Sequence, residues 1–244
     1  NRSFPGSKRG SLAARLAYIF LKEIVQRCDY GIDLHTGALH RSNLPQIRAN
    51  LDDPETKALA EAFAVPVLLN ANLRDGSMRQ AADEHGVKIL LYEAGEALRF
   101  DELSIRAGVR GILSVMQKLS MLPATKRSSR KSEPFIARSS SWERASESGL
   151  FRSMVGLGAR VKKGELLGIV YDPSDLFDQM EYEVRAQFSG LVIGKSNIPL
   201  VNEGDALFHI ARFEAIQKAA ASVEAFQDVS GYSANSAFDD QILI

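Results

Sequence analysis

The hydrophobic pattern of the first half of the chain alternates between the helical and the extended period. In residues 11–27 apolar side chains recur at helical spacing after Ser11, whose hydroxyl can cap the first turn. Residues 28–34 then form a short apolar run that predicts a strand, and this strand delivers Asp33 and His35. The first predicted unit is therefore a helix followed by a strand.

The same alternation continues as far as about residue 121. The expected elements are a helix from Asp53-Pro54 to about residue 64, a strand at 65–69, a helix from Ser77 to Gly86, a strand at 87–93 and a helix from Asp101. Residues 41–51 follow neither period and predict an irregular segment. This order favours an α/β fold with a mostly parallel sheet and flanking helices, in which functional groups gather at the carboxyl ends of the strands.

The pattern changes in the second half of the chain. The sequence V-x-x-G-[ED]-x-L occurs twice, as VKKGELL at 161–167 and as VNEGDAL at 201–207. Each Gly-acid pair suits a tight turn between strands, so the two units predict a small all-β, barrel-like domain with internal pseudo-symmetry. The expected organisation is an α/β catalytic domain at 1–122, a Ser- and Pro-rich linker at 123–134, a β-barrel or sandwich at 135–212, and a helix with a tail at 213–244.

Composition and charge narrow the classes of partner. The chain has 30 basic and 30 acidic residues, so no net charge attracts nucleic acid or an anionic membrane, and neither partner is expected. No apolar run approaches the roughly 20 residues of a membrane-spanning helix, and we expect a cytoplasmic protein. The single cysteine, Cys28, excludes an intrachain disulfide.

Two predicted strand ends carry side chains that could do chemistry. Asp33 and His35 share one side of a strand, where the carboxylate could orient a metal-bound imidazole. The alternative is a histidine that is satisfied by backbone at a strand end. Glu93 ends the second apolar strand just before Gly95, which suits either a general base or an acid that caps the next turn.

Three short motifs follow one another along the chain. NRSFPG begins with Asn1 and Arg2, DLHTG contains His35, and YEAGE contains Glu93. In this order, followed by the glycine-rich β region, they resemble the succinylglutamate desuccinylase/aspartoacylase family, which is related to the zinc carboxypeptidases. The resemblance implies that His35 is a zinc ligand, that Glu93 is the general base, and that Asn1 and Arg2 contact the substrate.

The resemblance also implies a reaction. It indicates a zinc-dependent deacylase that cleaves the amide bond of an N-acyl amino-acid-like small molecule, with the attacking water activated by zinc and Glu93. Arg2, with Arg48 and Arg79, would offset negative charge on the substrate or the intermediate. Asp33 would accept a hydrogen bond from the ring nitrogen of His35 that does not bind zinc. A metal-free binding protein on the same scaffold and a zinc carboxypeptidase are the alternatives.

One family motif has no counterpart in the sequence. The family has an upstream H-x-x-E motif that supplies two further zinc ligands, and a catalytic zinc normally has three protein ligands. His35 alone does not meet this requirement. We therefore expect the natural protein to extend further toward the N-terminus; a protein complete as printed would have an inactive site.

The repeated β motif also resembles the biotinyl and lipoyl carrier domains. A carrier needs a lysine on the hairpin between its two halves, and residues 171–190 contain none. Covalent attachment of such a cofactor is therefore not expected. We expect the β domain instead to shape the rim of the pocket or to form an interface between copies of the chain.

Overall fold

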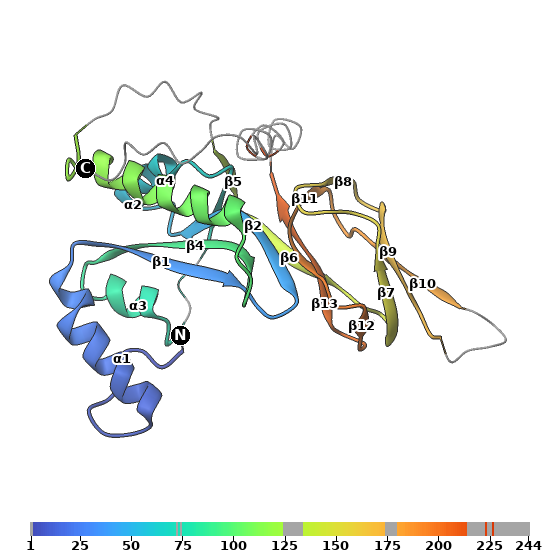
Figure 1. Ribbon diagram of the computed structural model, residues 1–244, viewed down its shortest axis with the longest axis horizontal. Coiled ribbons are helices and arrows are strands. Elements are labelled where there is room, and N and C mark those ends of the chain that lie inside the picture. The colour runs from blue at the N-terminus through green and yellow to red at the C-terminus, as the bar shows by residue number, and fades with distance from the viewer. Residues whose placement is uncertain are drawn as a thin grey trace.

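The computed structural model describes residues 2–71, 73, 75–123, 134–173, 180–213, 223 and 226. Asn1, most of the predicted linker and most of the predicted tail lie outside these residues. The described part contains an α/β unit and an accessory β unit (Figure 1).

The predicted helices and strands of the α/β unit form in the predicted order, and two further strands and a 3₁₀ helix join them. They are α1 (Leu12–Glu23), the 3₁₀ helix η1 (Val25–Arg27), β1 (Tyr30–Gly37), β2 (Arg41–Ala49), α2 (Pro54–Phe63), β3 (Val67–Asn70), α3 (Met78–Asp83), β4 (Lys88–Glu96), α4 (Glu102–Lys118) and β5 (Phe135–Ala137). The four predicted caps are confirmed, since the side chains of Ser11, Asp53, Ser77 and Asp101 each accept a hydrogen bond from a backbone N–H of the first turn.

The sheet is mixed, so the prediction of a mostly parallel sheet was wrong. In the described ranges nine strands form one sheet, with the path β1-β4-β2-β11-β13-β6 and with β3, β5 and β8 paired beside it. β1 is parallel to β4, but β2 is antiparallel to β4 and to β11. The reason is the short connection at 38–40, which reverses the chain between β1 and β2.

The interpretation of residues 41–51 as irregular was also wrong, because they contain β2. This strand pairs with β4, β3 and β11, and its five positions 43–47 are all buried. A strand covered on both faces shows no hydrophobic alternation. In β2 the buried positions include the polar residues Asn43 and Gln46, which concealed the strand further.

Helices cover both faces of the α/β part of the sheet. α2 and α4 lie over one face, and α1 and α3 lie on the other (Figure 1). Phe63 of α2 packs on Tyr92 of β4 with ring centroids 5.1 Å apart. A Cβ at Gly111 of α4 would overlap the ring of Phe63, so this glycine allows the close approach of α4 to α2.

Asp53 joins the start of α2 to the sheet. Its Oδ2 accepts hydrogen bonds from the backbone N–H of Thr56 at 2.8 Å, from the hydroxyl of Thr56 at 2.6 Å and from Nζ of Lys88 at 2.9 Å. These bonds, first those of Thr56 and then that of Lys88, lower the pKa of Asp53 to about 2.

Replacing Asp53 with alanine should lower the free energy of unfolding at pH 7 by about 1 kcal/mol, because the cap is lost. Asp53→Asn keeps the cap and loses only the ion pair with Lys88, so it should cost less. Because the folded-state pKa is depressed, the stabilisation by the carboxylate is present at neutral pH and fades between about pH 4 and pH 2. Urea unfolding at pH 7 and pH 3 measures both effects; an alanine deficit that is equal at the two pH values would contradict this account.

The accessory unit consists of two open sheets around a shared core, and no closed barrel forms among the described strands. Its strands are β6 (Ser139–Arg144), β7 (Gly149–Ser153), β8 (Arg160–Val161), β9 (Leu166–Tyr171), β10 (Glu181–Arg185), β11 (Gly190–Ser196), β12 (Leu200–Val201) and β13 (Ala206–Arg212). In the described part of the chain, β10-β9-β7-β12 form a separate sheet, whereas β6, β8, β11 and β13 extend the large one. Of the two predicted forms, a barrel or a sandwich, the described strands therefore correspond to the sandwich, because several of them pair with the α/β sheet and do not close on one another.

The quasi-repeat folds as two matching turns. Gly164 and Gly204 both have φ near +83°, a backbone conformation that favours glycine. Arg185 donates to the carbonyl of Gly164 at 2.8 Å, and Arg144 donates to the carbonyl of Gly204 at 2.7 Å. The turn of the first repeat is therefore tied to the end of β10, and the turn of the second repeat to the end of β6.

The two units share backbone pairing and a buried cluster. β11 pairs antiparallel with β2, and β5, which lies at the predicted start of the accessory domain, pairs parallel with β3. The shared cluster contains Leu44, Val67, Leu69, Ala137, Leu191, Ile193, Ala211 and Val223. In the residues that the structure describes, no helix is both long and apolar enough to cross a membrane.

Candidate active site

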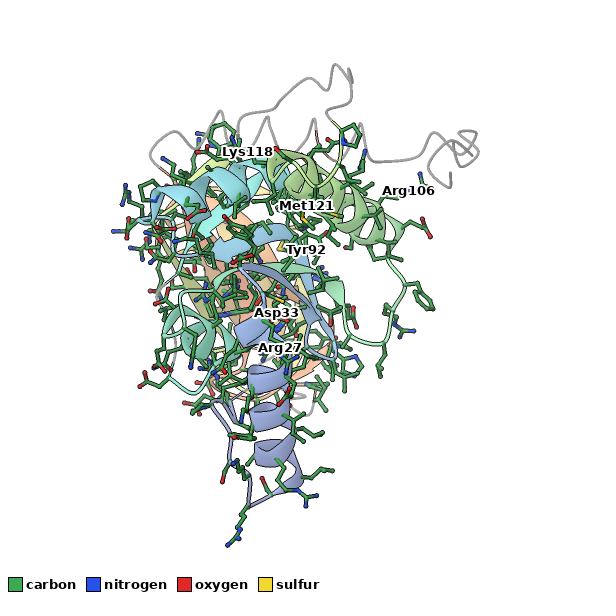
Figure 2. All side chains as sticks on the ribbon, turned by 90° about the vertical axis from the view of Figure 1, so that its left-hand side faces the viewer. Arg27, Asp33, Tyr92, Arg106, Lys118 and Met121 are labelled. Atoms are coloured by element: carbon green, nitrogen blue, oxygen red, sulfur yellow. The ribbon has the colours of Figure 1, made fainter. Side chains whose placement is uncertain are left out.

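The carboxyl ends of β1 and β4 place His35 beside Glu93. The two residues are direct partners in the parallel register of these strands, so their side chains emerge on the same face of the sheet. Tyr92 points toward α4, and its hydroxyl donates to the carbonyl of Ser104 at 2.7 Å. Figure 2 shows Asp33 on the other side of the sheet from Tyr92. The site therefore lies on the face opposite α2 and α4.

Asp33 holds the imidazole of His35. The distance between Oδ2 of Asp33 and Nε2 of His35 is 3.0 Å, and both side chains are partly buried. This hydrogen bond raises the pKa of His35. Burial of the ring lowers the same pKa, and the negative charge of Glu93 raises it further. A carboxylate on one ring nitrogen is the usual support of a metal-bound histidine, and the predicted role of Asp33 requires this contact.

Glu93 is held by two residues of β2. Its Oε2 accepts a hydrogen bond from Nδ2 of Asn43 at 3.0 Å and lies 3.3 Å from a guanidinium nitrogen of Arg48. The side chains of Glu93 and Arg48 are each 17% exposed, so this charge pair is largely shielded from water. Arg48, predicted to contact the substrate, thus contacts the predicted base directly.

Sequence reasoning missed Asn43 and Gln46 because it assigned no strand to their segment. Gln46 is the register partner of Glu93 on β2 and is fully buried. Its amide nitrogen and oxygen have no hydrogen-bond partner among the described residues, and such a group costs about 1–3 kcal/mol. One signal in the sequence could have indicated these two residues. Asn43 and Gln46 are amide side chains that lie among apolar residues in the segment 43–47.

The other predicted substrate contacts are placed as follows. Arg2 donates to the backbone carbonyl of Asp75 at 3.3 Å, in the loop before α3. Arg79 lies on α3 and donates to the carbonyl of Ala71 at 3.2 Å. Asn1 lies outside the described residues. The roles of these three residues stay predictions.

The donor set of this site does not by itself fit a catalytic zinc. The described residues contain no group of three or more histidine, cysteine or acidic side chains that could hold a metal ion. Two of the other histidines have different contacts: His85, just beyond α3, contacts the carbonyl of Ala81, and His209 stacks on Trp142 with ring centroids 4.7 Å apart. His35 is the histidine that lies directly beside Glu93.

Comparisons with known proteins show what the chain is similar to. Residues 1–119 match the family model of the succinylglutamate desuccinylase/aspartoacylase catalytic domain. An N-alpha-acetyl-L-2,4-diaminobutyric acid deacetylase from Halomonas elongata is 26% identical over 220 residues, which are 86% of this chain and 64% of the relative. The chain thus spans slightly less than two thirds of that protein.

Two solved structures resemble both units of the chain. The apo ectoine utilization protein EutE (DoeB) from Ruegeria pomeroyi has a TM-score of 0.77 and 25% identity, over 86% of this chain and 69% of that one. A succinylglutamate desuccinylase/aspartoacylase from Rhodobacter sphaeroides has a TM-score of 0.77 and 25% identity, over 87% and 67%. Residues 1–119, which form most of the α/β unit, therefore belong to the succinylglutamate desuccinylase/aspartoacylase family, as its catalytic domain.

Proposed function

We propose that this chain carries the catalytic carboxylate of a hydrolase that cleaves the amide bond of an N-acylated amino acid. The observation that carries the proposal is the pairing of His35 with Glu93 at the carboxyl ends of adjacent parallel strands. The relatives support it, since one is a deacetylase of an acetylated diamino acid and another is a succinylglutamate desuccinylase/aspartoacylase. The proposal concerns the natural polypeptide that contains this sequence.

In the proposed reaction Glu93 is the general base. The oxygen of a water molecule bonds to the acyl carbon, and Glu93 takes the proton of that water. Glu93 then passes the proton to the amine nitrogen as the C–N bond breaks, which leaves a carboxylic acid and a free amine. Asn43 and Arg48 fix Oε2 of Glu93, which favours a constant direction of proton transfer.

Zinc enters the proposal as the metal that the family resemblance implies. His35 is proposed as one ligand, with its ring held by Asp33. A bound zinc would polarise the acyl carbonyl and lower the pKa of a water molecule. The remaining ligands are proposed to come from outside the described residues, since these supply no complete set.

Arg2 and Arg79 are proposed to recognise the carboxylate of the amino-acid substrate. A guanidinium group offers two parallel N–H donors that match a carboxylate. The proposed partner is accordingly a small anionic or zwitterionic N-acyl compound.

The proposal is tested by a substrate panel with metal control. N-acetyl-2,4-diaminobutyrate, N-succinylglutamate, N-acetylaspartate and a dipeptide are incubated with the natural polypeptide, and the released amine is quantified with chelator, without additive and with added zinc. We expect amine release from at least one N-acyl amino acid, lost with chelator and restored by zinc. Cleavage of the dipeptide alone would favour a carboxypeptidase. Binding without turnover in the presence of zinc would favour a binding protein.

A further inference from the structure

The accessory β unit reaches the candidate active site through β11. In the antiparallel pairing of β11 with β2, Gly194 is the direct partner of Asn43, and Lys195 is the partner of Ser42. Asn43 is the residue whose Nδ2 donates to Glu93. A strand of the accessory unit therefore lies directly beside the residue that holds the proposed base.

Gly194 leaves just enough room for the side chain of Asn43. A Cβ at position 194 would lie 2.9 Å from Oδ1 of Asn43 and 3.1 Å from Cβ of His209. The side-chain amide is planar, with Oδ1 and Nδ2 on opposite sides. With Nδ2 donating to Glu93, Oδ1 lies on the side of Gly194, so a Cβ at position 194 would press on Oδ1 and turn Nδ2 away from Glu93.

The residues on the other side of Gly194 are closely packed. His209 is 4% exposed, its ring stacks on Trp142 with an interplanar angle of 9°, and its Nε2 lies 2.9 Å from Oγ of Ser140. The guanidinium of Arg41 lies over the Trp142 ring, 5.4 Å from its centroid. A side chain added at Gly194 could not be accommodated by movement toward His209 and would be directed against Asn43.

A second contact joins the loop after β11 to the ends of β2 and β4. Nδ2 of Asn197 lies 2.6 Å from Oγ of Ser42 and 2.8 Å from Oε2 of Glu96. The backbone N–H of Asn197 donates to the carbonyl of His40 at 2.7 Å. Asn197 therefore ties the first residues of β2 to the last residue of β4, three positions beyond Glu93.

We propose that Gly194 and Asn197 of the accessory unit are positioning residues for the general base. Gly194 acts through Asn43, and Asn197 acts through Ser42 and Glu96. This inference rests on the proposed function of Glu93. It assigns the accessory unit a part in catalysis: the unit completes the support of Glu93 by extending the sheet on which Glu93 lies.

The test compares Gly194→Ala with the matched variant Gly156→Ala in the natural polypeptide. No described atom lies within 4 Å of a Cβ at Gly156, so the same substitution there should leave turnover unchanged. Gly194→Ala should lower kcat about tenfold or more with little change in KM, because a displaced catalytic group lowers the rate of proton transfer. Unchanged kcat in Gly194→Ala would overturn the role of Gly194.

A double-mutant cycle separates positioning from general damage to the fold. If Gly194 acts through Asn43, the variant Asn43→Ala/Gly194→Ala should have the same kcat as Asn43→Ala alone. Independent, additive losses would overturn the proposal. Asn197→Ala provides a second variant should Gly194→Ala fail to fold, and it should lower kcat severalfold. Its control is Asn202→Ala, which should leave kcat unchanged, because the hydrogen bond of that turn is made by the backbone N–H of Asn202.

NMR of the Asn43 side-chain amide distinguishes this inference from the proposed function. The amide resonances should shift in Gly194→Ala and stay in place in Gly156→Ala, whether or not the wild type hydrolyses any substrate. A wild type without hydrolysis but with these shifts would refute the function and support the positioning contact. Unmoved resonances in an active enzyme would refute the positioning contact alone.

Discussion

Replacing Glu93 with glutamine is expected to lower turnover by about 10²- to 10⁴-fold, the usual contribution of a general base. Glutamine has nearly the same shape and can still accept the hydrogen bond of Asn43, but it cannot take a proton from water. The loss should therefore appear in kcat, while the zinc content stays close to that of the wild type. Steady-state release of the amine and metal analysis of the purified variant measure the two effects.

The control for this substitution is Glu61→Gln. Glu61 lies on α2, on the other side of the sheet from the site, and its side chain is about half exposed beside Lys57. The same change of charge there should leave kcat at the wild-type value. If Glu93→Gln retained more than a tenth of the wild-type turnover, Glu93 would not be the base.

Replacing His35 with alanine is expected to abolish stoichiometric zinc binding by the natural polypeptide. A catalytic zinc depends on about three protein ligands, so the loss of one imidazole removes a large share of the binding free energy. Asp33→Asn, which changes only the support of the ring, should weaken zinc binding by about 10- to 100-fold. Zinc titration calorimetry and metal analysis after zinc-supplemented purification give the order wild type, Asp33→Asn, His35→Ala.

His85→Ala is the matched control for the histidine. His85 lies just beyond α3 and contacts the carbonyl of Ala81, so its removal should not change the zinc content. Zinc content that stays at the wild-type level in His35→Ala would exclude His35 as a ligand. Equal zinc affinity in Asp33→Asn and the wild type would limit Asp33 to a local hydrogen bond.

The helix starts of the α/β unit could be predicted because their cause is local. Asp53 and Asp101, like the other two caps, bond to a backbone N–H three residues away, and that spacing is visible in the sequence. The apolar run of β4 and the strand that carries Asp33 and His35 were recognisable for the same reason. The pairing of His35 with Glu93 followed from one further rule, that parallel strands bring their carboxyl ends together.

The sequence by itself thus determined the helices, the two strands that carry His35 and Glu93, the matching turns at Gly164 and Gly204, and the family resemblance. Only the tertiary structure decided that residues 41–49 form β2, that the sheet is mixed, and that β11 extends it. The physical reason is that β2 is stabilised by pairing with segments far away in the chain, at Leu68, Tyr92 and Gly194, and not by its own periodicity. The residues that hold Glu93 lie on this strand, so they became visible only once those distant partners were in place.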